Sequence, residues 1–248
     1  MAGNCGFGAL VRFGGGDVRS LVVVVVMGIF GFIALSGPLA PLRIALFPQD
    51  LASGPQGIAA DIFALTGIAP LVTAGVISAA LIVWALAYAP LRASKRTMIW
   101  GVVAGLSIVW CFGATSWLNA QSFGEIGVEG MSFAAPVGRT LLFLMTSTAG
   151  GIGFSVGSVG GVVLGAILGS MVLRRFRWEA CDDVREMGRQ VLGAALMGVG
   201  GVVAMGCSVG QGVSGIAALA WSGPVTLVAI ALGAAFGLHR LIFGYAPE

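Results

Sequence analysis

Two cysteines, each followed three residues later by a glycine, are the side chains best suited to chemistry in this sequence. One lies in Cys5-Gly6-Phe7-Gly8 and the other in Cys207-Ser208-Val209-Gly210. A thiol in apolar surroundings stays protonated near neutral pH and donates a weak S–H hydrogen bond without repelling an anion. Phosphate oxygens usually recruit Arg or Lys instead. The pair therefore favours a soft sulfur oxyanion or a sulfide-like species, and it is also compatible with a persulfide relay.

Glycine and small residues surround both cysteines, which disfavours a regular helix and exposes backbone N–H groups before the next helix begins. Such N–H groups form a natural anion site. The plainer alternative is that each cysteine is a small apolar residue packed beside a tight turn. On the first interpretation, the substrate-binding residues of the two motifs are Cys5, Gly6, Gly8, Gly206, Cys207, Gly210 and Gln211.

The composition shows what must position these cysteines. Of 248 residues, 58% are hydrophobic and only 9% are charged. Soluble domains carry roughly 25% charged residues, so the sequence predicts an integral membrane protein. The net charge of +3 and the arginines clustered between apolar runs argue against a nucleic-acid partner.

The remaining cysteines indicate packing. Cys111 falls inside an apolar run and Cys181 in a polar loop, and the chain has a single histidine. This set fits neither a disulfide framework nor a zinc site, so no metal or cofactor is expected.

Six apolar runs approach the roughly 20 residues that a membrane-spanning helix needs. They lie at 20–42, 67–89, 98–118, 152–173, 190–206 and 224–243. Arginine and lysine after the second and fourth runs place both of those loops in the cytoplasm. An even number of crossings must separate the loops, so 131–150 is expected to be a re-entrant segment broken by Pro136 and Gly150-Gly151.

The same counting predicts inverted repeats. Arg12 and Arg19 place the chain after the first cysteine in the cytoplasm, whereas the uncharged stretch after Cys207 lies outside. The two cysteines then approach the midplane from opposite faces, as in many transporters. We expect an all-α, polytopic membrane domain over residues 1–248, with about six spanning helices, re-entrant segments and repeat halves of 1–118 and 119–248.

Arg139 is the charged side chain of the re-entrant segment. An ionisable residue at membrane depth indicates a functional site, so Arg139 is a candidate to attract an anion from outside. Alternatively, it extends to the outer interface or pairs with Glu125 or Glu129.

Several segments together resemble the YeeE/YedE sulfur-transport family, over nearly the whole chain and in the family's order. They are residues 2–8, 14–19, 35–40, 133–138, 176–180 and 206–212. The resemblance implies uptake of thiosulfate, or a related sulfur or selenium species, across the bacterial inner membrane. Cys5 and Cys207 match two of the cysteines that line the family's narrow central path.

The resemblance also implies a small soluble sulfur-carrier protein as a cytoplasmic partner, and an N-terminal segment that this sequence is expected to lack. Its implied class is a non-enzymatic permease. The rival from the residues themselves is a membrane-embedded thiol enzyme in which Cys207 becomes persulfidated and passes sulfur to a cytoplasmic acceptor.

Overall fold

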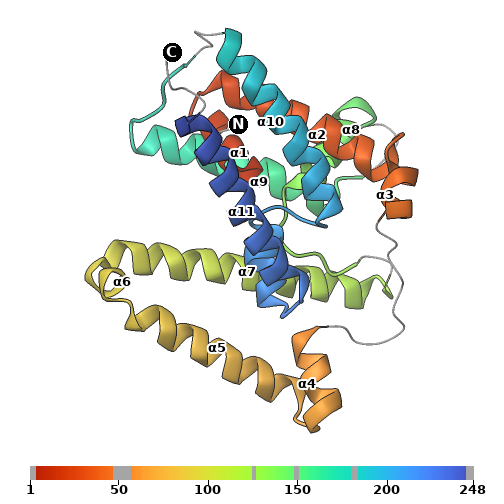
Figure 1. Cartoon of the computed structure of the whole chain (residues 1–248), viewed down its shortest axis with the longest axis vertical. Helices are drawn as coiled ribbons and strands as arrows, with labels where there is room; N and C mark the ends of the chain where they lie inside the picture. Colours follow the sequence, from red (N-terminus) through yellow and green to blue (C-terminus); the bar gives the residue numbers. More distant parts are fainter. Residues whose placement is uncertain (1–3, 47–56, 125–126, 148–150, 180–183, 244–248) are drawn as a thin grey trace. The chain divides into compact units, whose positions relative to one another are not determined.

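The computed structural model describes residues 4–46, 57–124, 127–147, 151–179 and 184–243. Within these ranges the chain forms twelve helices and no sheet, with one isolated backbone bridge between Asp17 and Glu179 (Figure 1). The prediction of an all-α protein is confirmed for this part of the chain. Cys181, Glu125 and Gly150 lie outside the described residues.

Among the described residues, five helices are long and apolar enough to cross a membrane. They are α2 (Val18–Ser36), α5 (Pro70–Ala87), α7 (Lys95–Gln121), α9 (Phe154–Val172) and α11 (Ser222–Phe243). The expected run at 190–206 falls instead in α10 (Val184–Val203), whose apolar part, Met187–Val203, is shorter. The structure therefore supports five candidate spans, and a sixth crossing stays a prediction.

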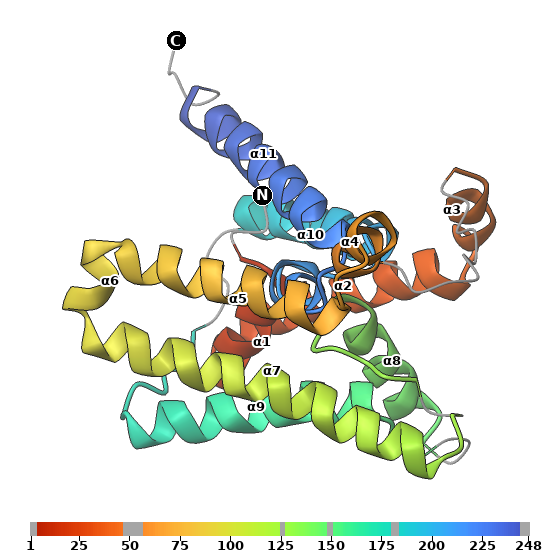
Figure 2. The ribbon, with the colours of Figure 1, turned by 90° about the horizontal axis from the view of Figure 1, so that it is seen from below.

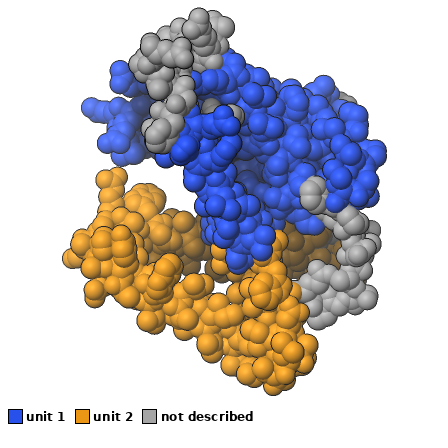
Figure 3. All heavy atoms as spheres, viewed as in Figure 1, with its two compact units in different colours: residues 1–49, 132–213, 224–248 blue, residues 50–131, 214–223 orange. Residues whose placement is uncertain are grey.

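The chain divides into two compact units that interleave in sequence (Figure 3). Unit 1 comprises residues 1–49, 132–213 and 224–248, and unit 2 comprises residues 50–131 and 214–223. This division follows packing and differs from the predicted repeat halves at residue 118, which stay a prediction.

Helix α2 is the centre of unit 1. It packs against α1 (Gly6–Gly14), α8 (Ala134–Met145) and α10, and Figure 2 shows α2 and α10 close together, as in Figure 1. Val23, Met27 and Ala34 are buried along it. Glycine lets the backbones meet, since a Cβ at Gly138 of α8 would lie 2.9 Å from the carbonyl oxygen of Gly28.

The turn between α1 and α2 is held by the segment after α9. The backbone N–H of Arg177 donates to Gly15 at 3.2 Å, and that of Val18 donates to Glu179 at 3.1 Å. Asp17 caps α2 by accepting from the backbone N–H of Arg19 at 3.0 Å. Two arginine-bearing segments far apart in sequence therefore lie side by side.

The segment expected to be re-entrant forms α8, a helix of 12 residues. Pro136 lies in its first turn, where a missing N–H costs no helical hydrogen bond. The expectation that Pro136 breaks this segment is therefore wrong, because the proline stands at the start of a helix. Helix α8 is too short to span a bilayer alone, and the re-entrant path stays a prediction.

Unit 2 is built around a helical hairpin. Helix α4 (Ile58–Thr66) contacts α5, and α5 joins α7 through the short α6 (Ala89–Ala93), as Figure 1 and Figure 2 show. The remaining elements are α3 (Ala40–Leu46), which follows α2, and the π-helical η1 (Gly210–Gly215) after Cys207.

Candidate functional site

Cys5 is the N-cap of α1. Its Sγ accepts a hydrogen bond from the backbone N–H of Gly8 at 3.4 Å, and its carbonyl accepts from Ala9 at 2.9 Å. The thiol therefore occupies the place of the Ser, Thr or Asp side chain that usually satisfies the first free N–H groups of a helix.

Cys207 has the same local structure. Its Sγ accepts from the N–H of Gly210 at 3.4 Å, and its carbonyl accepts from Gln211 at 2.8 Å. Gly210 leaves room for a neighbour, since a Cβ there would lie 2.7 Å from the Oγ of Ser132. The repeated Cys-x-x-Gly motif thus corresponds to a repeated local structure, in which the thiol caps the helical turn that follows it.

The end of α10 brings Cys207 into position. The N–H of Gly206 donates to Gly201 at 2.8 Å and that of Met205 donates to Val202 at 3.1 Å. This is the Schellman pattern, with Met205 at the left-handed position, φ 55°, that glycine usually occupies. The chain reverses sharply there, and Cys207 follows two residues later.

Both cysteines line one cavity of about 340 Å³ in unit 1. Its walls come from the start of α1 and from α2, α8, α10 and α11. The lining residues are Cys5, Gly6, Met27, Ala134, Met197, Gly200, Gly201, Ala204, Gly206, Cys207, Ser208, Thr226, Ala229 and Ile230. Asp, Glu, Lys, Arg and His are absent from this described lining, so the polar groups facing the cavity are thiols, hydroxyls and backbone.

Two methionines of the lining were not foreseen from the sequence. Met27 lies on α2 and Met197 on α10, and each adds a soft, polarisable thioether to the two thiols. Met27 also packs close to Gly6, because a Cβ at Gly6 would lie 2.6 Å from the Met27 Sδ. A methionine in an apolar helix carries no sequence signal that separates lining from core.

Aromatic packing fixes the first motif against the lining. The ring of Phe7 lies 5.1 Å, centroid to centroid, from that of Phe133. Phe133 is fully buried and directly precedes Ala134, which lines the cavity. This contact ties the start of α1 to the start of α8.

The other expected ligands have different surroundings. Gln211 is buried, and its side-chain Nε2 donates to the carbonyl of Ala204 at 3.0 Å, at the end of α10. Arg139 is exposed on α8 and donates to Ser155 on α9 at 3.2 Å. Gly6 and Gly206 line the cavity, whereas Gly8, Gly210, Gln211 and Arg139 are not among its lining residues. Substrate contact by these four stays a prediction.

Cys111 belongs to a different environment in unit 2. It is buried on α7, and its Sγ lies 3.6 Å from the carbonyl oxygen of Glu129, which also accepts from Thr115 at 3.2 Å. These contacts are those of a packed side chain. In the described part of the chain, no group of three or more His, Cys, Asp or Glu residues is placed to hold a metal ion.

Comparison with known proteins shows the family of this chain. A family model described as sulphur transport matches residues 1–236. The thiosulfate transporter TsuA of Spirochaeta thermophila is 25% identical over an alignment of 248 residues that covers 94% of this chain and 71% of that protein. TsuA of Escherichia coli K12 is 31% identical over 118 residues, 48% of this chain and a third of its own length (33%). With nearly its whole length matched, the chain belongs to the sulphur transport family.

Proposed function

We propose that this chain imports thiosulfate, or a closely related inorganic sulfur species, across a bacterial inner membrane, and that the cysteine cavity is part of the path. The observation that carries the proposal is that Cys5 and Cys207, from opposite ends of the sequence, line one cavity with matching cap geometry. The names of the two similar proteins support thiosulfate as the substrate.

The cavity's chemistry suits a soft divalent anion that must be released again. A fixed Lys or Arg in an apolar cavity would hold a dianion tightly. Here the two helical turns begin at Cys5 and Cys207, so their partial positive charge lies at the lining. In this mechanism the helix starts compensate the anion's charge, while the thiols and thioethers contact its terminal sulfur.

The orientation proposed from the sequence has structural support. The backbone of residues 15–18 pairs with that of residues 177–179, and the Arg19 side chain forms an ion pair with Glu179 at 3.9 Å, so two segments that are both expected in the cytoplasm lie together. We propose that this end of unit 1 faces the cytoplasm, where a small sulfur-carrier protein would receive the product. Import then runs from outside past the cysteines to this end, in an inverted-repeat permease.

A persulfide relay enzyme is the second candidate, and the lining weighs against it. A thiol that attacks a sulfur donor needs a base or a neighbouring cation to form the thiolate. The described lining has no Asp, Glu, Lys, Arg or His. Reversible contact without a covalent intermediate fits these residues better, and selenium analogues would be accepted by the same ligands.

The test is uptake of ³⁵S-thiosulfate into cells that lack their own importers and express this chain or a variant. Cys207→Ala and Cys5→Ala are each expected to reduce uptake at least tenfold. Cys111→Ala is the matched control, because it removes a thiol buried in unit 2 that does not line the cavity. Membrane abundance of each variant is measured by immunoblot.

A binding assay separates failure of transport from failure of recognition. In purified protein, thiosulfate is expected to slow maleimide labelling of Cys207, while sulfate at the same concentration and ionic strength does not. Normal uptake in both cysteine variants would overturn the proposal. A persulfide trapped on Cys207 after exposure to thiosulfate would establish the relay enzyme instead.

A further inference from the structure

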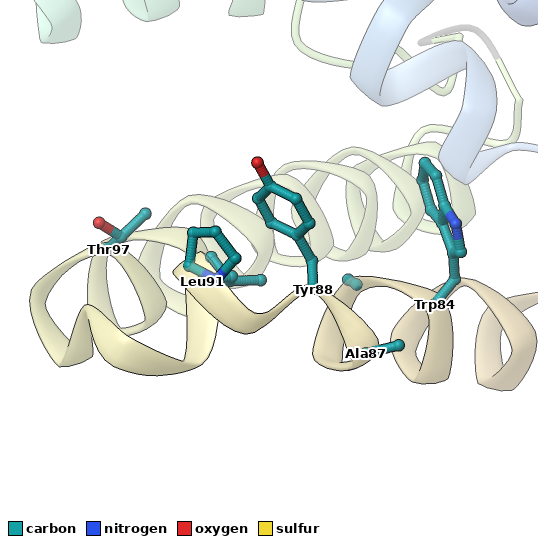
Figure 4. Close-up of a pocket in the computed structure, with 7 residues that line it drawn as sticks. Trp84, Ala87, Tyr88, Leu91 and Thr97 are labelled. Carbon is teal, nitrogen blue, oxygen red and sulfur yellow. The ribbon is translucent and has the colours of Figure 1, made fainter.

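Unit 2 has a hollow of its own where α5 ends and α7 begins. It has a volume of about 720 Å³. The residues that line it are Trp84, Ala85, Ala87, Tyr88, Pro90, Leu91 and Thr97. Figure 4 shows the side chains of Trp84 and Tyr88 on the same side of the chain. The lining side chains are thus mainly apolar, and their polar groups are the hydroxyls of Tyr88 and Thr97 and the indole N–H of Trp84.

Three cations are close in sequence to residues that line this hollow. Arg92 follows Leu91 directly, and Lys95 and Arg96 precede Thr97. All three side chains are exposed. The sequence has no Asp or Glu between Asp61 and Glu125, so this end of the hairpin carries uncompensated positive charge.

The start of α7 adds to that charge. Lys95 and Arg96 occupy the first turn of this 27-residue helix, where the helix dipole already contributes partial positive charge. Cations are unfavourable at the start of a helix because the positive end of the helix dipole repels them. A bound anionic group would offset this repulsion. The apolar hollow and the nearby cations Arg92, Lys95 and Arg96 therefore suit a single ligand that has an apolar body and an anionic end.

The expected depth of the hollow in the membrane fits such a molecule. Trp84 is 77% exposed, Tyr88 66% and Trp100 63%, and each lies four to eight residues from the nearest of the three cations. Tryptophan and tyrosine at such positions mark the headgroup level, and the three cations place this level at the cytoplasmic leaflet. Basic pockets at that level bind anionic lipid headgroups.

We propose that this hollow binds an anionic phospholipid of the cytoplasmic leaflet. The phosphate lies against Arg92, Lys95 and Arg96, and an acyl chain lies along Trp84 and Leu91. A second copy of this chain is disfavoured as the occupant, because two such faces would bring three positive charges against three. This inference does not depend on thiosulfate transport.

The test uses the full chain purified in detergent, with phosphatidylglycerol and phosphatidylcholine added separately and bound lipid counted by native mass spectrometry. Phosphatidylglycerol is expected to bind and phosphatidylcholine is not. The triple variant Arg92→Gln, Lys95→Gln, Arg96→Gln is expected to bind phosphatidylglycerol about a hundredfold more weakly, from the contribution of each basic residue near an anionic surface. The matched control is Arg174→Gln, Arg175→Gln, Arg177→Gln, which removes the same charge from unit 1.

An aromatic variant, competition with inorganic phosphate and a check for dimers complete the test. If the first triple variant does not fold, Trp84→Ala with Tyr88→Ala keeps all three charges and is still expected to weaken phosphatidylglycerol binding. The proposal is overturned by equal binding of the two lipids, by equal loss in both triple variants, or by unchanged binding in the aromatic variant. Displacement of the lipid by millimolar inorganic phosphate would show a simple anion site, and dimers that persist without lipid would show a second copy there. Either result would also overturn it.

Discussion

Helix α2 of unit 1 and helix α5 of unit 2 have nearly the same length and are both long apolar runs, but they have different neighbours. Of the most apolar window of α2, 39% is buried inside the protein, against 6% for α5. Helix α2 packs against α1, α8 and α10 and supplies Met27 to the cysteine cavity. Helix α5 contacts α4 and α6 and leaves large side chains such as Leu71 exposed.

Hydropathy and burial are therefore separate properties in a membrane protein. An apolar side chain is equally compatible with lipid and with a protein core, so composition predicts insertion but not packing. Close backbone approach makes the distinction here. A Cβ at Gly28 of α2 would lie 2.7 Å from Leu141, whereas one at Gly75 of α5 would meet nothing within 4 Å. Unit 1 is therefore the precisely fitted part, and it contains the site.

Replacing a buried phenylalanine in unit 1 should have the largest effect on stability. Phe133→Ala removes a side chain that is 0% exposed and deletes its contact with Phe7. The lost contacts are not refilled, so we expect a loss of about 3 kcal/mol. Phe123→Ala in unit 2, where the side chain is 99% exposed, should change stability by less than about 0.5 kcal/mol. Unfolding in mixed micelles, followed by circular dichroism, measures both, and equal losses would remove the contrast between the units.

Glycine-to-alanine substitutions should change the free energy of unfolding in opposite directions in the two units. A Cβ at Gly198 of α10 would overlap the carbonyl of Met27 on α2, whereas a Cβ at Gly105 of α7 meets nothing within 4 Å. Overpacking should cost Gly198→Ala about 1 to 3 kcal/mol. Gly105→Ala should be neutral or stabilising by up to about 1 kcal/mol, because alanine favours helix. The same unfolding measurement decides, and a stabilised Gly198→Ala would show that α2 and α10 do not pack this closely.

The spanning helices could be located from the sequence, but their ends depended on local chemistry. The expected run 67–89 matches α5 closely because Pro70 begins it. The run 20–42 is too long, since the extended backbone at Gly37 ends α2 at Ser36 although apolar residues continue. The run 190–206 starts too late, because the polar residues from 184 onward also belong to α10.

The candidate site was predictable only in its two motifs, from which Cys5, Gly6, Gly206 and Cys207 line the cavity. The repeated Cys-x-x-Gly motif was enough to predict that Cys5 and Cys207 belong to one site, and each of them caps the turn that follows it. Met27, Met197 and Thr226 depend on which face of each helix turns inward, and no local pattern in the sequence records that. Gln211 was expected to bind substrate, but its amide bonds to a carbonyl at the end of α10, a partner that only the three-dimensional path of the chain provides.

Helix caps give the smallest contrast between the units. Asp17 accepts the capping hydrogen bond of α2 at 3.0 Å in part-buried surroundings and also accepts from Ser20 Oγ at 2.8 Å, whereas the capping hydrogen bond that Ser94 accepts in α7 is exposed, at 3.4 Å. Asp17→Ala should therefore cost about 1 kcal/mol, near the middle of the range for N-caps, and Ser94→Ala only about 0.5 kcal/mol. Asp17→Asn separates cap from charge: it keeps an acceptor for the Arg19 N–H but loses the ion pair with the Arg19 side chain at 3.8 Å. If Asp17→Asn is as unstable as Asp17→Ala, the charge of Asp17 and not its capping hydrogen bond stabilises this turn. The larger loss of stability expected at α2 than at α7 would then come from electrostatics at the membrane surface.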